Sequence, residues 1–217
     1  MRARAPARNS NYIPTGNLQK VQKVHGVLIL LNLMNLLPPL NPMNLSPDYT
    51  DPVSAPAHRK DAPASVSCFV LTISDTRTEA NDASGDAIVG LLTGAGHQVA
   101  GRRIVRDDPA AVREAVQAEL STADVIVATG GTGISARDST YEAFAALLDK
   151  RLDGFGELFR MLSYAEIGAA AMLSRAAAGS IGSTAVFSLP GSENAVRLAM
   201  TKLILPEIGH VVRELRR

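Results

Sequence analysis

The sequence has little of several features that mark whole classes of protein. Its one cysteine, Cys68, excludes an internal disulfide, and because no histidine-containing motif surrounds it we expect a buried apolar side chain rather than a nucleophile. No Gly-Lys-Ser or Gly-Lys-Thr occurs, which excludes a Walker phosphate-binding loop. Aromatic residues make up only 4% of the chain, and no basic stripe is visible, so nucleic acid is not an expected partner.

Long apolar runs are scarce as well. The strongest, from Val27 to Leu40, is shorter than the roughly 20 residues that span a bilayer, and two Asn and two Pro interrupt it. It follows a basic start, as in a secretion signal, but no small-residue cleavage site comes soon after it. We therefore expect no membrane span and a cytoplasmic protein.

Residues 1–64 differ in composition from the rest of the chain. They hold nine of the twelve prolines and are rich in Asn and Ser, which favours an irregular extension rather than a domain. They carry seven Lys or Arg against three Asp or Glu, whereas residues 65–217 carry fifteen against eighteen, so the expected domain is slightly acidic. The extension could also be an apolar docking segment, or the natural start could lie nearer Met34 or Met43.

From residue 65 onward, strand and helix patterns alternate, which is typical of an α/β domain with a mostly parallel sheet. Residues 152–157, with two glycines around an aromatic residue, predict a loop, and residues 163–166 predict a capping box in the helical region that follows. Pro206 is expected to open or kink the last helix. The strands are expected at 66–73, 97–105, 125–128 and 184–189, and helices are expected to begin near Asp82 or Ser84, at Asp108-Pro109, near Ser139 and after Ser192.

The most distinctive stretch runs from Val125 to Asp138. A short buried strand ends in Thr129-Gly130-Gly131-Thr132-Gly133, where three glycines let the backbone approach a ligand and direct its N–H groups at it. A helix is expected at once, because Ser139-Thr140-Tyr141-Glu142 has the spacing of a capping box. A glycine-rich turn between a strand end and a helix start favours a phosphate, so the stretch predicts an anion site with Asp138 at its edge.

Two other interpretations of this turn remain open. Residues 131–136 also satisfy the loose dinucleotide pattern G-x-G-x-x-A, but that pattern should follow the first strand of a βαβ unit, and here the turn follows the third expected strand. A tight turn that binds nothing would need only one or two glycines. The phosphate site is therefore the favoured interpretation.

Acidic residues accompany the expected phosphate site. In an open parallel sheet, ligands bind beyond the carboxyl ends of the strands, where Ser74-Asp75, Asp107-Asp108, the glycine-rich turn and Pro190-Gly191-Ser192 should meet. Asp108 is readily explained as a helix cap, Asp75 as a turn residue and Pro190-Gly191 as a chain reversal. Asp107 and Asp138 would repel a phosphate unless a cation is shared, so they predict Mg²⁺ and phosphoryl or nucleotidyl transfer, with Arg106 and Arg137 offsetting charge on a polyphosphate.

Five motifs in this order resemble one known family. Over residues 65–217 the sequence is similar to the molybdenum cofactor biosynthesis proteins of the MoaB/MogA type, which are related to the G domain of gephyrin. The stretch from Phe159 to Gly168 favours the MoaB branch. The motifs are Leu71-Thr72-Ile73-Ser74-Asp75, Asp82-Ala83-Ser84-Gly85, Thr129 to Gly133 with Asp138, Gly154-Phe155-Gly156-Glu157, and Leu189-Pro190-Gly191-Ser192.

The resemblance implies a three-layer α/β/α sandwich that assembles as a trimer or hexamer. It implies binding of molybdopterin and its adenylylation by Mg·ATP, which yields adenylyl-molybdopterin and pyrophosphate. Carried over, Thr129, Gly130, Gly131, Thr132 and Gly133 would hold the pterin phosphate, and Asp107 and Asp138 would position Mg²⁺ and the triphosphate as catalytic and metal-binding residues. Ser74, Asp75, Pro190, Gly191 and Ser192 would line the nucleotide and pterin pocket.

Two expectations accompany this resemblance. Apolar stretches at 167–173 and 196–205 exceed what one domain should cover, which favours a homo-oligomer. A molybdopterin-binding protein without transfer activity remains the alternative to the enzyme, because branches of such families can keep the pocket and lose the catalytic activity. The presence of both Asp107 and Asp138 favours the enzyme.

The first prediction concerns residues 1–64. Deleting Met1 to Ala62 should leave melting and activity nearly unchanged, because the pattern from Val66 onward contains its own caps and buried strands. The measurement is differential scanning calorimetry of the full-length and the shortened protein. A fall in Tm of more than about 10 °C, against about 4 °C for a 1 kcal/mol effect at this size, would show that the apolar run docks on the domain.

Overall fold

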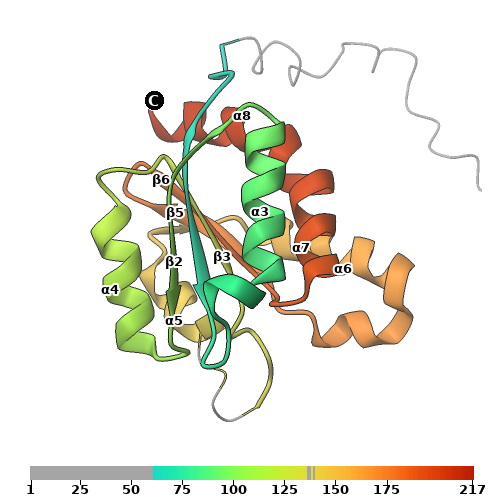
Figure 1. Cartoon of the computed structure of the whole chain (residues 1–217). Coiled ribbons are helices and arrows are strands. Elements are labelled where there is room, and N and C mark those ends of the chain that lie inside the picture. The colour runs from blue at the N-terminus through green and yellow to red at the C-terminus, as the bar shows by residue number, and fades with distance from the viewer. Residues whose placement is uncertain (1–60, 136–137, 139) are drawn as a thin grey trace, which may run out of the picture. The chain divides into compact units, whose positions relative to one another are not determined.

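The computed structural model describes residues 61–135, 138 and 140–217 (Figure 1). These residues form an α/β fold around a six-stranded sheet, as predicted. The strands are β1 (Ser67–Ile73), β2 (Gln98–Val105), β3 (Val125–Thr129), β4 (Lys150–Arg151), β5 (Ala177–Ile181) and β6 (Thr184–Leu189). The helices are η1 (Glu79–Asn81), α3 (Ala83–Gly94), α4 (Pro109–Glu119), α5 (Thr140–Leu147), α6 (Asp153–Ile167), η2 (Gly168–Leu173), α7 (Glu193–Ala199), the π-helix η3 (Met200–Ile204) and α8 (Leu205–Leu215).

The sheet is mostly parallel, with strand order β2-β1-β3-β6-β5-β4. β2, β1, β3 and β6 run parallel, whereas β5 pairs antiparallel with β6 and the short β4 pairs antiparallel with β5. A hairpin that turns at Gly182, with φ of 56°, joins β5 to β6. Because β2, β1, β3 and β6 run in the same direction, their carboxyl ends lie at one edge of the sheet.

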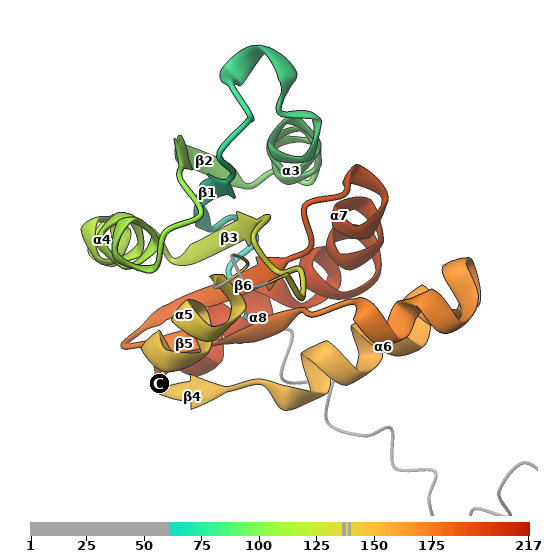
Figure 2. The same cartoon turned by 90° about the horizontal axis from the view of Figure 1, so that it is seen from below.

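Helices cover both faces of the sheet, which makes three layers (Figure 2). Alternate residues of β1 point to opposite faces: Cys68 and Val70 pack with α3, α6, α7 and α8, whereas Phe69 and Leu71 pack with α4 and α5. Strands buried on both faces explain the continuous apolar runs in the sequence. Burial raises the pKa of the Cys68 thiol to about 12, so this cysteine is an inert core residue, as expected.

Two helix caps agree with the sequence. Asp82 accepts a hydrogen bond from the N–H of Gly85 at 3.0 Å at the start of α3. Asp108 accepts from the N–H groups of Ala110 and Ala111 at the start of α4, with Pro109 as the first helical residue. Pro206 lies in the first turn of α8, directly after the π-helical turn η3, so it marks an irregularity in one long helical run.

Two local predictions were wrong. Residues 153–157 are not a loop but the first part of α6, and residues 163–166 lie inside that helix rather than at a helix start. Phe155 and Phe159 lie four residues apart on one buried face, with ring centroids 6.5 Å apart, and Phe155 also packs edge-on to Phe187 of β6 at 5.3 Å. This burial outweighs the low helix propensity of the two glycines. The capping box at Ser139 lies partly outside the described residues.

The apolar stretches divide between surface and core. Residues 196–205 mostly belong to the core, where Val196, Met200 and Ile204 are buried, so the domain itself covers this stretch. Helices α6 and η2 do expose large apolar side chains: Leu158, Met161, Tyr164, Ile167, Met172 and Leu173. Among the described residues, no helix combines the length and apolarity needed to cross a membrane.

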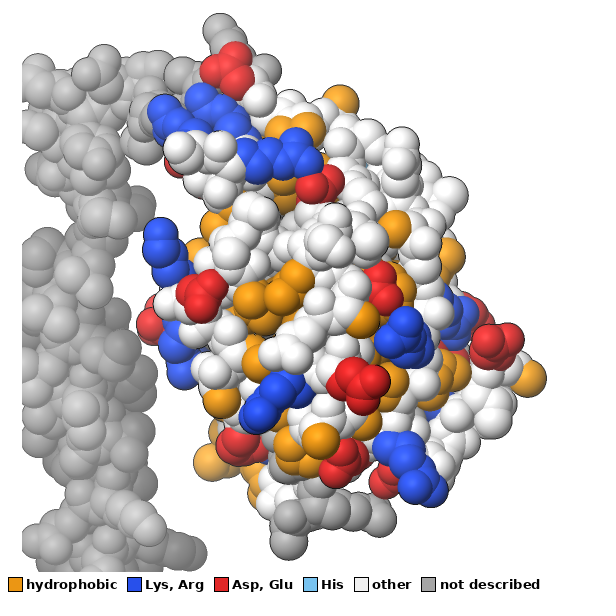
Figure 3. Space-filling model, turned by 90° about the vertical axis from the view of Figure 1, so that its left-hand side faces the viewer, with side chains coloured by type: hydrophobic (Ala, Val, Ile, Leu, Met, Phe, Trp, Pro, Cys, Tyr) orange, Lys and Arg blue, Asp and Glu red, His pale blue; other side chains and the backbone are white. Residues whose placement is uncertain are grey.

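The beginning of the described chain contacts α8. The carbonyl of Pro63 lies against Gly209, where an added Cβ would come within 2.6 Å of it. Asp61 forms an exposed ion pair with Arg213 at 3.2 Å, which is worth at most about 1 kcal/mol. On the α4 side of the molecule, acidic and basic side chains are interspersed with apolar ones (Figure 3).

A buried acid ties β1 to the start of α3 and to β2. The Asp82 side chain is fully buried and accepts hydrogen bonds from the hydroxyl of Thr72 at 2.6 Å and from Arg102 at 2.6 Å. Burial alone would raise the pKa of this carboxyl, but the hydrogen bonds from Thr72, Gly85, Arg102 and Ser84 outweigh it and lower the pKa below its ordinary value.

We predict that Asp82→Asn costs about 3 kcal/mol of unfolding free energy, because it removes a buried partner of Arg102. The control is Asp86→Asn, which removes the exposed partner of the same arginine and should cost under about 1 kcal/mol. Because the folded pKa lies below the unfolded value, the stabilisation by Asp82 is present above about pH 4 and lost as the pH falls further. In urea unfolding, the free energies of unfolding of the unmodified protein and of Asp82→Asn should therefore converge in acid. An equal loss in both variants would contradict the assignment.

Candidate functional site

A cavity of about 270 Å³ lies at the carboxyl ends of the parallel strands. Ser74 and Asp75 follow β1, Asp107 follows β2, and Gly130 follows β3. These residues come from different strands, and the parallel arrangement of the strands brings them to one place. The cavity is lined by Thr72, Ile73, Ser74, Asp75, Thr76, Arg77, Ser84, Asp107, Thr129, Gly130, Gly131, Asp138 and Gly191.

The glycine-rich turn has a backbone that only glycine adopts easily. Gly130 and Gly131 have φ of 105° and 62°, in the left-handed region. An added Cβ would come within 2.1 Å of the carbonyl oxygen of Ile73 at position 130, and within 2.1 Å of the hydroxyl of Thr140 at position 131. The turn is therefore packed tightly between the end of β1 and the start of α5.

Hydrogen bonds connect this turn to β6 and to the residues after it. The N–H of Gly130 donates to the carbonyl of Leu189 at 3.0 Å, and the hydroxyl of Thr129 donates to the carbonyl of Pro190 at 3.0 Å. The Gly130 amide is thus already used and is not available to an anion. The amides of residues 131–133 have no acceptor within the described part of the chain, so these can bind a ligand.

The two acids of interest are held on either side of the turn. Asp107 accepts from the hydroxyl of Thr140 at 2.7 Å, and its carboxylate lies beside Gly131. Asp138 accepts from the N–H and the hydroxyl of Ser135, at 2.9 and 2.5 Å, and its carboxylate lies beside Gly133. Asp138 therefore closes a turn with Ser135.

The structure brings together most of the residues predicted for the site. Ser74, Asp75, Asp107, Thr129, Gly130, Gly131, Asp138 and Gly191 line the cavity. Thr132 and Gly133 do not line it; their carbonyls accept hydrogen bonds from Arg175 on another side of the turn. Pro190 and Ser192 line a separate cavity of about 330 Å³ beside α6 and α7, where Ser192 also caps α7.

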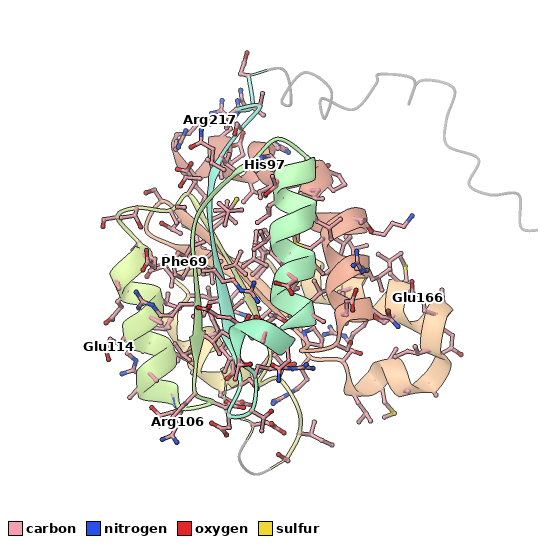
Figure 4. All side chains as sticks on the ribbon, in the orientation of Figure 1. Phe69, His97, Arg106, Glu114, Glu166 and Arg217 are labelled. Atoms are coloured by element: carbon pink, nitrogen blue, oxygen red, sulfur yellow. The ribbon has the colours of Figure 1, made fainter. Side chains whose placement is uncertain are left out.

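The sequence did not lead us to predict Arg77, a basic side chain of the cavity. Arg77 lines it and donates to the carbonyl of Asn81 at 2.6 Å. Its position two residues after Asp75, in the segment that follows β1, was the available signal. Arg106, labelled in Figure 4, lies just after the carboxyl end of β2 but does not line the cavity. Arg137 lies outside the described residues.

The donor set is compatible with Mg²⁺. No group of three or more His, Cys, Asp or Glu side chains that could hold a metal ion occurs in the described ranges. However, Mg²⁺ prefers oxygen ligands, and it usually binds through one or two carboxylates together with substrate phosphates rather than through a complete protein cage. Asp107 and Asp138, at one polar cavity, fit that mode of binding.

We predict that Gly131→Ala destabilises the domain by more than about 1 kcal/mol, because it requires both a positive φ and space that Thr140 occupies. The control is Gly90→Ala in the middle of α3, where an added Cβ meets nothing within 4 Å. That change should stabilise the helix by about 0.5–1 kcal/mol. Urea unfolding of both variants is the measurement, and equal effects would show that the turn is not constrained.

Comparisons with known proteins agree on one family. Residues 69–210 match the family described as a probable molybdopterin binding domain. The chain is 55% identical over 168 residues to molybdenum cofactor biosynthesis protein B of Bacillus cereus, covering 76% of this chain and 99% of that protein. The corresponding Bacillus subtilis protein is 51% identical over the same coverage.

Solved structures of the same proteins share the fold. A crystal structure of molybdenum cofactor biosynthesis protein B is 57% identical, with a TM-score of 0.70, and covers 72% of this chain and 99% of its own. The tungsten cofactor synthesizing protein MoaB from Pyrococcus furiosus is 41% identical, with a TM-score of 0.63, and covers 72% and 100%. The family predicted from the sequence motifs is thereby confirmed. With this identity over nearly the whole length of its relatives, the chain belongs to the molybdenum cofactor biosynthesis protein B (MoaB) family.

Proposed function

We propose that this protein binds molybdopterin and adenylylates it with Mg·ATP. The observation that carries the proposal is the cavity at the sheet edge, which combines a constrained glycine-rich turn with two anchored carboxylates, Asp107 and Asp138. The match to a probable molybdopterin binding domain supports the pterin as substrate. The reaction would take place where these groups meet.

The charge of the cavity supports a metal-dependent reaction of phosphates. Among the described residues, Asp75, Asp107 and Asp138 contribute three negative charges and Arg77 one positive charge, so these lining side chains sum to −2. Phosphates would be repelled there unless a cation is shared. Bound Mg²⁺, held by Asp107 and Asp138, would offset that charge and polarise the phosphate oxygens.

The proposed transfer needs only molybdopterin and Mg·ATP as reactants. An oxygen of the terminal phosphate of molybdopterin attacks the α-phosphorus of ATP, and the bond from that phosphorus to the β-phosphate oxygen breaks. Pyrophosphate leaves with the electron pair. The amide of Gly131, which lines the cavity, would bind the attacking phosphate, and Arg77 would bind charge on the triphosphate. Thr140 and Ser135 would keep the two carboxylates oriented.

A binding protein without transfer activity is the second candidate. Each carboxylate already accepts a hydrogen bond from a neighbouring hydroxyl, Asp107 from Thr140 and Asp138 from Ser135. Those bonds would also occur if the two acids only stabilised the loop. The two candidates differ in what loss of the charge does to pyrophosphate release.

We predict that Asp138→Asn and Asp107→Asn each lower pyrophosphate release at least about 100-fold, or about 2.7 kcal/mol of transition-state stabilisation. Molybdopterin affinity should persist, because the backbone amides of the turn are unchanged. Asp108→Asn is the matched control: it is the adjacent acid, it caps α4 and does not line the cavity, and Asn caps about as well as Asp. Near-normal release in both site variants would leave the binding protein as the better explanation.

We also propose that the chain forms a homo-oligomer through α6 and η2. Met161, Tyr164 and Met172 are 61, 65 and 80% exposed, which is unusual for side chains of this size gathered on adjoining elements. Sedimentation at micromolar concentration should show an oligomer, and Met161→Glu should shift it toward the monomer. Ile134→Glu, an exposed apolar residue elsewhere, should not. A monomeric unmodified protein would refute the proposal.

A further inference from the structure

Arg175 contacts the glycine-rich turn from outside the cavity. It lies in the segment between η2 and β5, and its side chain is 23% exposed. It does not line the cavity. Its contacts are with residues more than 30 positions earlier in the chain, at the turn and at the first residues of α5.

The guanidinium group of Arg175 uses all of its nitrogens. Nε donates to the carbonyl of Thr132 at 2.9 Å, and Nη2 donates to the carbonyl of Gly133 and approaches that of Asp138 at 3.5 Å. Nη1 donates to the carboxylate of Glu142. One side chain therefore joins three carbonyls of a single loop to α5.

Two residues of α5 orient this guanidinium. Its carbon lies 4.9 Å from the centroid of the Tyr141 ring, in a cation–π contact. Glu142 binds the other edge, and the hydrogen bond from Arg175 lowers the pKa of the Glu142 carboxyl. The planar guanidinium group lies between a ring and a carboxylate and has little freedom to rotate. Its remaining N–H donors are therefore directed at the carbonyls.

The geometry of the peptide bond transmits this contact to the amides. In a trans peptide, the C=O and the N–H that follows it point in opposite directions, and the described residues contain no cis peptide. When Arg175 holds the carbonyls of Thr132 and Gly133, it directs the N–H groups of Gly133 and Ile134 away from itself. The contact therefore fixes the backbone next to Gly131, which lines the cavity, before a ligand arrives.

We propose that Arg175 is a positioning residue that holds the glycine-rich turn, and with it Gly131 of the cavity, in place for a phosphate-bearing substrate. The proposal rests on the proposed function for the identity of that substrate, but not for the effect on the turn itself. Arg175 acts through residues 132–134 and touches no substrate. Lysine cannot replace it, because one ammonium lacks the fork that reaches Thr132, Gly133 and Glu142 together.

The test compares Arg175→Lys and Arg175→Met with Arg197→Met. Arg197 is an exposed arginine on α7 that pairs with Glu193 and does not contact the turn, so it is the matched control. Hydrogen exchange of the ligand-free proteins reports on residues 130–135. Molybdopterin binding, together with KM and kcat for pyrophosphate release, reports on the site.

Both Arg175 variants should speed exchange of the Gly130 and Ser135 amides, which are hydrogen-bonded in this turn, by about tenfold and weaken molybdopterin affinity by a similar factor, about 1.4 kcal/mol. KM for molybdopterin should rise while kcat changes little, which is the reverse of the pattern expected for Asp138→Asn. The control should alter neither quantity. A purely structural role would lower Tm and speed exchange throughout the domain without a change confined to the turn.

Unchanged exchange in the turn, or full rescue by Arg175→Lys, would overturn the proposal. If the unmodified protein binds no molybdopterin, the proposed function fails, and the exchange measurement still decides whether Arg175 orders the turn. The two failures are therefore distinguishable.

Discussion

The site depends on the close approach of the β3–α5 turn to the end of β1. An added Cβ at Gly130 would meet the Ile73 carbonyl, and one at Gly131 would meet Thr140. This packing brings the segments after β1, β2 and β3 to one cavity. It also places Asp107, which follows β2, within hydrogen-bonding distance of Thr140 at the start of α5. A larger residue in the turn would separate these groups, so the constraint on the backbone is also a constraint on the chemistry.

Charge in this region is arranged on two sides of one loop. The cavity side carries Asp107 and Asp138, whose negative charge suits a metal-bound phosphate rather than a free one. Away from the cavity, Arg175 donates hydrogen bonds to the carbonyls of Thr132 and Gly133. Arg175 thus supplies partners for carbonyls of the loop that no backbone N–H within the described residues satisfies.

The antiparallel part of the sheet contributes to this arrangement. β5 pairs with β6, and Arg175 lies two residues before β5 begins. Arg175 thus comes from the segment that leads into β5, while Leu189 at the end of β6 and Pro190 directly after it accept hydrogen bonds from Gly130 and Thr129. The loop is therefore connected to both sides of the hairpin of β5 and β6, which explains how a segment rich in glycine can keep one conformation.

The sequence by itself determined the features that depend on neighbouring residues: the buried strands β1, β3 and β6, a cap at Asp82 or Ser84, the cap Asp108, and the glycine-rich turn after β3. These follow from local patterns of burial, capping and backbone freedom. The motifs also identified the family, which the comparisons confirm. Only the tertiary structure decided that residues 153–157 are helical, because Phe155 gains its burial against distant strands. It alone placed Arg77 in the cavity and Arg175 on the turn, because contacts that join residues some 40 positions apart are set by how the chain folds back, which no local pattern specifies.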